Sequence, residues 1–438
     1  MAGEPQASCL DRPLPKDWGV CALQDLVESD RGISYGIIQP GQHDPSGVPV
    51  IRVNNLRNGR IETRDVLMVS PKIEAKYERT RLSGGEVLLS VVGTLGECAV
   101  VPQSLVGWNV AGAVAVIPIK SDFDPNWIAN CLRSREIQRL IQMWATTTVQ
   151  ATLNLRDVRR LPILSPPRGE IERIMDIIGS LGDEIELTQR INETLETMAR
   201  AIFKAWFVDF VPVKAKVGGA VGFRGMPQRI FDQLPDRLVE TVLGLVPAGW
   251  ETSAISDAAE YVNGMAFTRH ENGKGRMIIR IAELNSGPGS STKYSDIYAE
   301  PQYTAFPGDI LFAWSGSLGV HRWHRDEALV NQHIFRVIPI DRPQWYVYYR
   351  LVEAMPFFRA IAATKATTMG HIKRSHLGDA TFVEPPASYI EAADKHIRPL
   401  FDLVHINERQ SLRLVTLRDT LAPALLDGEI RFSRNSDA

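Results

Sequence analysis

Residues 85–96 read GEVLLSVVGTLG, and a second version of this stretch, GDILFAWSGSLG, occupies residues 308–319. Each version joins a run of strand-favouring residues to a glycine-rich turn, which predicts a buried strand followed by a tight loop. Because the pattern returns 223 residues later, we expect the chain to contain two copies of one domain. A repeat this long indicates domain duplication, since solenoid repeats are only about 20–50 residues long.

Other paired segments follow in the same order along the chain. They are LPKDW at 14–18 with VPAGW at 246–250, IRVNNL at 51–56 with IRIAEL at 279–284, PNW at 125–127 with PQW at 343–345, and PP at 166–167 with PP at 385–386. Their offsets drift from 232 through 228 to 218 and 219, as expected when two copies have gained and lost loop residues. A short amphipathic helix is expected after each of the tryptophans Trp127 and Trp345.

Composition limits the class of protein. The chain has 438 residues, 44% of them hydrophobic, which allows two or three domains. Its net charge of −2 argues against binding nucleic acid by bulk charge, so any such site must be local. The cysteines are scattered without a C-x-x-C spacing, and no metal site or disulfide is predicted. With no signal peptide or long apolar run, we expect a cytoplasmic protein without a membrane span.

The second part of each copy has a heptad-like pattern. Core-compatible residues recur at steps of three and four, which favours a long helix with one stripe facing a partner. Two matched helices of roughly 35–40 residues, or about 55 Å, predict an antiparallel coiled coil; the alternative is an ordinary helix packed on its own domain. The stripes are Ile171, Ile174, Ile178, Leu181, Ile185, Thr188, Asn192, Leu195 and Ile202, and Ile390, Ile397, Leu400, Val404, Asn407, Leu414 and Leu421.

The predicted fold class is therefore α+β, with two mixed α/β domains, each followed by a long helix. We expect the domains at residues 1–168 and 246–387, the helices at 169–210 and 388–430, and a tail at 431–438. Residues 211–245 are expected to form a connector, interpreted as a flexible linker without a contact role.

The charges are unevenly distributed along the chain. Residues 170–210 hold nine acidic and four basic side chains, and residues 388–430 hold seven and five, giving −5 and −2. The remainder therefore carries +5, an arrangement that suits globular domains facing phosphate, although an ordinary solvated surface gives the same count.

A threonine-rich segment precedes the Pro-Pro pair in each copy. Its hydroxyl, amide and cationic groups are suited to phosphate oxygens and base edges; the alternative is a threonine-rich turn with ordinary surface arginines. The candidate DNA-binding residues are Thr147, Thr148, Gln150, Asn154 and Arg156 in the first copy and Lys365, Thr367, Thr368, His371, Lys373 and Arg374 in the second.

Taken in order and twice over, these motifs, together with AIFKAWFVDF at residues 201–210, resemble the specificity subunits of type I restriction-modification systems. The resemblance covers residues 14–432. It implies two target-recognition domains that read the two halves of a split double-stranded DNA sequence, and no catalytic residues in this chain. Because a split target with unlike halves needs two readers whose side chains differ, we expect DNA contacts where the copies differ most, at Asn54, Asn55, Arg57, Thr94, Ser315 and Ser317. Arg280 is a further candidate DNA-binding residue.

The resemblance further implies partner subunits. Two methyltransferase subunits would bring S-adenosylmethionine, and restriction subunits would bring ATP- and Mg-dependent translocation and cleavage. An aromatic cluster at the end of the first helix is a candidate docking surface, or alternatively a local cap. The candidate partner-binding residues are Phe203, Trp206, Phe207, Phe210, Leu421 and Leu425.

Two other functions are alternatives to this one. A protein-binding scaffold would need the coiled coil but no DNA readout. A methyltransferase would need an Asn/Asp-Pro-Pro-aromatic tetrapeptide, whereas residues 165–168 read SPPR and residues 384–387 read EPPA. The histidines His321, His324 and His333 lack the clustered carboxylates or cysteines of a metal site.

Overall fold

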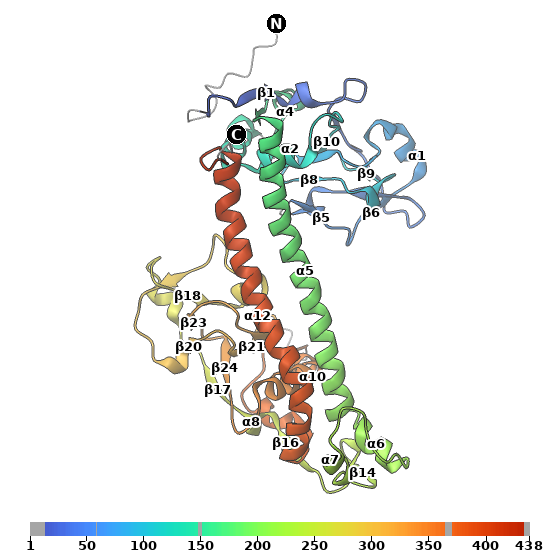
Figure 1. Cartoon of the computed structure of the whole chain (residues 1–438), viewed down its shortest axis with the longest axis vertical. Coiled ribbons are helices and arrows are strands. Elements are labelled where there is room, and N and C mark those ends of the chain that lie inside the picture. The colour runs from blue at the N-terminus through green and yellow to red at the C-terminus, as the bar shows by residue number, and fades with distance from the viewer. Residues whose placement is uncertain (1–13, 58, 148–150, 364–369, 433–438) are drawn as a thin grey trace, which may run out of the picture. The chain divides into compact units, whose positions relative to one another are not determined.

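The computed structural model describes residues 14–57, 59–147, 151–363 and 370–432. It divides into two compact units: residues 1–183 with 416–438 form unit 1, and residues 184–415 form unit 2. Each unit contains a mixed α/β domain and part of each of two 40-residue helices, α5 (Arg168–Phe207) and α12 (Ala387–Leu426) (Figure 1). The predicted fold class is confirmed, and both helices begin and end within a few residues of the expected positions.

The domain of unit 1 has a four-stranded sheet in the order β2-β10-β7-β8 and a three-stranded sheet in the order β6-β3-β9. In the first sheet all pairs are antiparallel, whereas β3 and β9 are parallel. Its elements are β1 (Gly19–Ala22), β2 (Ser34–Tyr35), β3 (Val48–Ile51), β4 (Leu56–Arg57), β5 (Arg60–Ile61), β6 (Leu67–Val69), α1 (Pro71–Glu74), β7 (Val87–Ser90), β8 (Cys98–Val100), β9 (Asn109–Val110), β10 (Val114–Ile117), α2 (Pro125–Arg133), α3 (Arg135–Trp144), β11 (Thr146–Thr147), β12 (Ala151–Thr152), α4 (Leu155–Arg159) and β13 (Pro162–Ser165).

The domain of unit 2 repeats this plan with sheets in the orders β17-β24-β21-β22 and β19-β18-β23-β20, the pair β18 and β23 being parallel. Its elements are α6 (Val211–Val217), α7 (Gln228–Asp232), β14 (Leu238–Thr241), β15 (Gly244–Pro247), β16 (Glu251–Ala254), α8 (Ile255–Ala258), β17 (Ala259–Asn263), β18 (Arg276–Ile279), α9 (Ile281–Ser286), β19 (Tyr294–Ser295), β20 (Thr304–Ala305), β21 (Ile310–Ala313), β22 (Gly319–Arg322), β23 (Ala328–Val330), β24 (Ile334–Pro339), α10 (Gln344–Ala363), α11 (His376–Asp379) and β25 (Thr381–Glu384).

The duplicated stretch forms the same strand in both units. Its apolar residues become β7 and β21, which occupy equivalent places in the four-stranded sheets and are buried along their whole length. Helices are present at both tryptophans, and each begins shortly before its tryptophan; α2 is short as predicted, whereas α10 has 20 residues and is not. The start of α2 follows from local chemistry, because the side chain of Asp124 accepts a hydrogen bond from the backbone N–H of Asn126 and Pro125 opens the helix.

The helices α5 and α12 pair antiparallel, with contacts recorded in each unit. In unit 2 the buried amide of Asn192 donates to Glu408 Oε1 at 3.0 Å and accepts from Asn407 Nδ2 at 2.9 Å. In unit 1, Ile174 near the start of α5 shares a core with Leu425 near the end of α12. The predicted antiparallel coiled coil is therefore confirmed, and its polar seam contact favours one register over others.

The aromatic end of α5 is inside the core of unit 2, which corrects the predicted docking surface. Phe203, Trp206, Phe207 and Phe210 are each at most 6% exposed. The first three contact aromatic side chains of α10 or α12, and Phe210 contacts the ring of Trp250. The guanidinium of Arg350 on α10 donates to the carbonyl of Phe207 and lies over the rings around it.

The same correction holds at the end of α12. Leu425 is buried in the core of unit 1, and Leu421 packs against that core. Burial by the domain removes Leu425 from any docking surface, whereas Leu421 is only partly buried and stays a prediction.

The connector is also packed rather than a free linker. Val213, Ile230 and Phe231 are buried in the core of unit 2. Lys216 Nζ donates to the carbonyls of Asp232 and Leu234, which ties α6 to the end of α7. The interpretation of residues 211–245 as a linker without contacts was wrong.

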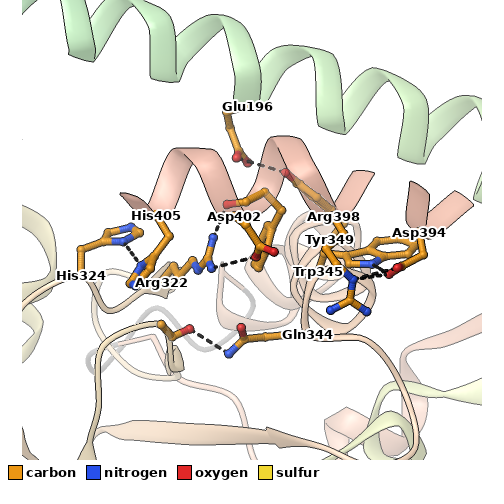
Figure 2. Close-up of polar contacts among 12 residues, drawn as sticks. Glu196, Arg322, His324, Gln344, Trp345, Tyr349, Asp394, Arg398, Asp402 and His405 are labelled. Atoms are coloured by element: carbon orange, nitrogen blue, oxygen red, sulfur yellow. Dashed lines mark hydrogen bonds and ion pairs between the residues drawn. The ribbon is translucent and has the colours of Figure 1, made fainter. Parts of the chain in front are cut away.

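Polar contacts join the domain of unit 2 to its two helices, as Figure 2 shows. Arg322 lies over the ring of Phe401 at 3.7 Å and donates to its carbonyl. Tyr349 donates to Glu196 Oε2 on α5 at 3.1 Å. The Nδ1 atoms of His324 and His405 lie 2.9 Å apart, so one imidazole donates to the other, which requires that at least one be neutral.

The histidine pair predicts a loss of stability in acid. Burial, followed by the nearby guanidinium of Arg322, lowers the pKa of His324 to about 3 and that of His405 to about 4. An unfolded histidine titrates near 6.5, so below that pH the unfolded chain takes up protons that the folded chain excludes. We expect the midpoint of urea unfolding to fall between pH 7 and pH 5.

Substitution of the pair tests this assignment, and substitution of an exposed histidine is the control. His324→Asn with His405→Asn should shrink the acid-dependent part of the shift, whereas His270→Asn, at an exposed position of the same unit, should leave it unchanged. An equal pH dependence in all three proteins would contradict the assignment to this pair.

Candidate nucleic-acid interface

In unit 1, three of the predicted DNA-binding residues come together at an open cleft. Asn54, Arg57 and Thr94 are exposed and line a hollow of about 690 Å³. Arg57 ends β4 at the start of the β4–β5 hairpin, and Thr94 lies in the glycine turn after β7. The other lining residues are Arg52, Val53, Leu56, Val92, Gly93, Glu97, Ala111 and Ala113.

Asn55, also predicted to bind DNA, is instead buried beneath this cleft. Its side chain is 2% exposed and all of its polar groups are used within the domain. The Oδ1 atom accepts from the backbone N–H of Arg52 at 3.0 Å, and Nδ2 donates to the carbonyls of Glu62 and Arg64 at 3.1 and 3.2 Å. Adjacent asparagines in a sequence gave no sign of which one faces inward.

The threonine-rich segment lies beside the glycine turn of the cleft. Strands β11 and β12 pair antiparallel, and the backbone N–H of Gly93 donates to the carbonyl of Ala151 at 3.0 Å. Val92 and Thr152 form an isolated antiparallel bridge. The backbone of Thr147 is part of this strand pair; Thr148 and Gln150 lie outside the described residues.

Asn154 and Arg156 are exposed at the beginning of α4, just after β12. The backbone carbonyl of Asn154 accepts from the N–H groups of Asp157 and Val158, and its exposed side chain makes no capping bond. The two polar segments predicted far apart in the sequence are thus neighbours in unit 1.

Unit 2 brings the equivalent segments together in the same way. Ser315 and His371 form the isolated bridge that matches Val92 and Thr152, and the N–H of Gly316 donates to the carbonyl of Gly370 at 2.9 Å. Ser317 and Lys373 are exposed, and His371 is partly exposed. Lys365, Thr367 and Thr368 lie outside the described residues.

Three predicted contacts of unit 2 are engaged inside the domain. Ser315 is 8% exposed, so it is mainly a core residue. The guanidinium of Arg280 pairs with Glu283 at 2.6 Å and donates to the carbonyl of Ser291, which corrects its prediction as a DNA contact. Arg374 is exposed, but one of its nitrogens donates to the carbonyl of Tyr261.

Two charged residues of the cleft were missed by the sequence prediction. Arg52 and Glu97 line the hollow beside Asn54 and Thr94. The repeat alignment already matched Arg52 with Arg280, so the signal for Arg52 was present. No such signal marked Glu97, because its counterpart in the second copy is Val320.

The described ranges give no sign of a metal site or a membrane span. Within them, no three histidine, cysteine, aspartate or glutamate side chains are grouped so that they could hold a metal ion. Over the same residues, no helix has both the length and the apolar character needed to span a membrane.

Comparison with known proteins gives matches across both units. The family model described as "Type I restriction modification DNA specificity domain" matches residues 15–197 and 247–389. The chain is 26% identical over 186 residues to the EcoBI specificity subunit of Escherichia coli, covering 42% of this chain and 39% of that protein. It is 26% identical to the HindI specificity subunit of Haemophilus influenzae, covering 62% and 70%.

Other matches extend over nearly the whole chain. The MjaIX specificity subunit of Methanocaldococcus jannaschii is 22% identical, covering 95% of this chain and 94% of that protein. The crystal structure of a type I restriction-modification S subunit from M. genitalium matches with a TM-score of 0.56 and 11% identity, covering 96% and 98%. At this identity the structural match supports the fold alone.

The cleft of unit 1 predicts a role for Arg57. An arginine at a groove edge can pair with a guanine, and its loss costs about 1–3 kcal/mol of binding. We expect Arg57→Ala to weaken binding of the cognate DNA by at least about fivefold in a fluorescence-anisotropy titration. Arg229→Ala, at an exposed arginine of α7, is the control and should bind as the unsubstituted chain does; equal binding by both variants would argue against the cleft.

Proposed function

Because the chain belongs to the family of type I restriction-modification DNA specificity domains, we propose that it is the DNA-reading subunit of such a system. Its two domains read the two halves of a split double-stranded target, and the antiparallel helices connect them. One observation carries this proposal: in both units the strand end at the glycine turn pairs with the threonine-rich segment. The pairs are Val92 with Thr152 in unit 1 and Ser315 with His371 in unit 2.

The asymmetry of the two interfaces supports a split target with unlike halves. Around the turn of unit 1 lie Asn54, Arg57 and Thr94, whereas the matching positions of unit 2 are Ala282, Asn285 and Ser317. Arginine pairs with guanine and asparagine with adenine in the major groove, so different side chains at equivalent positions select different bases. A chain with two identical readers would instead suit a symmetric target.

In this proposal the chemistry belongs to partner subunits. Methyltransferase subunits, two of them by the twofold repeat of this chain, would bring S-adenosylmethionine, and restriction subunits would bring ATP and Mg²⁺. This chain contributes recognition and a docking surface. The scaffold alternative predicts that DNA affinity does not depend on the interface residues, and the methyltransferase alternative predicts methylation by the chain alone.

The coiled coil of unit 2 offers a docking surface in place of the buried aromatic cluster. Leu187, Ile191 and Met198 on α5 are 41–49% exposed, and Leu403 and Ile406 on α12 are 42% and 59% exposed. At 100° per residue, the three residues of α5 lie within about 40° of one another, and the two of α12 within about 60°.

These five residues lie on one face of the helix pair. Counted from the contacting Asn192 and Asn407, both sets fall on the same rotational side, and in an antiparallel pair this places them on a common face. Glu196 and Phe401, which contact the domain of unit 2, lie on the other side. An exposed apolar row on a polar helix pair is typical of a protein-binding surface.

Exchange of one domain tests the two-reader model. Replacing residues 30–165 with the equivalent region of a relative should change one half of the methylated motif and leave the other unchanged, because each reader contacts its own half-site. The measurement is mapping of methylated bases in a host that expresses the hybrid with its modification subunits. A change in both halves, or in neither, would contradict the model.

A second prediction concerns the apolar row. Met198→Glu with Ile406→Glu should abolish co-elution with the methyltransferase subunit, because an unpaired charge would be buried in the interface. Size-exclusion chromatography with light scattering measures the assembly, and circular dichroism checks the fold. Val242→Glu, at a fully exposed position in the β14–β15 turn, is the matched control. Normal assembly of the double variant would exclude this surface.

A further inference from the structure

A buried polar side chain occupies the same place in both units, four residues after the end of a strand. Strand β3 ends at Ile51 and is followed by Asn55, which is 2% exposed; β18 ends at Ile279 and is followed by Glu283, which is 3% exposed. Each accepts a hydrogen bond at 3.0 Å from the backbone N–H of the arginine directly after the strand. The position is thus a shared feature of the internal repeat, although the residue differs.

In unit 1 the side chain of Asn55 joins the chain before the β4–β5 hairpin to the chain after it. Asn55 bonds to Arg52 before the β4–β5 hairpin and to the carbonyls of Glu62 and Arg64 after it. A backbone bond from Glu62 N–H to the carbonyl of Asn55, at 2.8 Å, completes the closure. The hairpin that carries Arg57 to the edge of the cleft is therefore held at its base by one amide.

In unit 2 the equivalent residue is Glu283, whose carboxylate holds a helix and the loop after it instead of a hairpin. Glu283 lies in α9 and accepts from Arg280 Nε and Nη2 at 3.0 and 2.6 Å and from Thr292 Oγ1 at 3.0 Å. Thr292 Oγ1 in turn accepts from the backbone N–H of Gly289 at 2.8 Å. Burial opposes ionisation of Glu283, but these bonds hold its pKa below the usual range.

The hydrogen-bonding groups of Asn55 and Glu283 suit the segments that these residues hold, the β4–β5 hairpin in unit 1 and α9 with its following loop in unit 2. Asn55 donates to backbone carbonyls, which pins a hairpin by its main chain. Glu283 only accepts, and it gathers the guanidinium of Arg280 and the hydroxyl of Thr292, which pins a helix and the loop after it. Reading a base edge requires a donor or acceptor held within a fraction of an ångström, so a mobile hairpin or loop would lose discrimination before it lost contact with phosphate.

We propose that Asn55 and Glu283 are matched positioning residues that do not touch DNA. Asn55 fixes residues 56–57 and 59–64, which carry Arg57, and Glu283 fixes residues 284–293, which carry Asn285, the counterpart of Arg57. The proposal rests on the DNA-reading function proposed above. It goes further because it assigns the specificity of each half-site to a buried residue outside the interface, Asn55 or Glu283, which we call the hub of its domain. It also predicts that the two hubs act independently.

The test uses two nearly isosteric substitutions in the full chain assembled with its modification subunits. Asn55→Asp keeps the acceptor for Arg52 and removes both N–H donors, and Glu283→Gln removes the charge that holds Arg280. Binding to a library in which each half-site is varied one base pair at a time, read by sequencing, gives a discrimination ratio for each half. We expect Asn55→Asp to lower that ratio roughly tenfold in one half only, and Glu283→Gln to do so in the other half only.

A third variant covers the case in which a hub substitution prevents folding. Thr292→Val, at a partly exposed position, removes the bond from Oγ1 to Glu283 and the bond that Oγ1 accepts from Gly289. A smaller loss of discrimination in the same half as Glu283→Gln would support the proposal. Asn109→Asp is the matched control, since Asn109 is fully buried and donates to Glu74 and to the carbonyl of Tyr77, both outside the segment that Asn55 holds. It should lower the melting temperature and leave both ratios unchanged.

The remaining outcomes separate this proposal from the one beneath it. If the unsubstituted chain discriminates at both halves and the hub variants do so equally well, the positioning role is overturned and the DNA-reading function stands. Loss of discrimination by Asn109→Asp to the same extent would also overturn the role, because general destabilisation would then explain it. If the unsubstituted assembly shows no sequence preference, both proposals fail.

Discussion

A long helix with one apolar stripe is stable in water only when that stripe is covered, and this constraint organises the whole chain. The helices α5 and α12 cover each other, and their ends complete the domain cores. Ile174 and Leu425 share the core of unit 1, and Phe203 shares that of unit 2 with Trp345. At the polar point of the seam, Asn192 bonds to Asn407 and Glu408, where a shift in register would leave a buried amide unpaired.

The antiparallel pairing makes each unit from segments that are far apart in the sequence. In unit 1, Arg431 pairs with both Asp17 and Glu170, and Trp18 donates to Glu170, so the beginning of the described chain meets its end. Each domain therefore depends on helix residues contributed by both copies. A mutation near the end of α12 is expected to affect the domain of unit 1, which precedes it by hundreds of residues, and a mutation near the end of α5 is expected to affect the domain of unit 2.

The proposed DNA-reading surfaces follow from a division between a repeated frame and variable segments. The strands β7 and β21 and their glycine turns keep the same backbone bonds in both units, whereas the side chains around them differ. Loops can change on a fixed frame without cost to the core, which suits two readers of unlike half-sites. The hubs Asn55 and Glu283 occupy the same position relative to the repeated strands, but their residue types differ between the two copies, as in the variable segments.

The sequence by itself determined the duplication, the α+β class, the two long helices and their pairing, because these depend on periodicity and on local preferences that recur along the chain. It also pointed to Asn54, Arg57 and Thr94, which the structure places at one cleft. Only the tertiary structure decided which polar or aromatic residues face inward. Asn54 and Asn55 are chemically identical neighbours, and the cluster around Phe203 is equally apolar in a core or on a surface; burial depends on what other segments pack against them, which no local pattern contains.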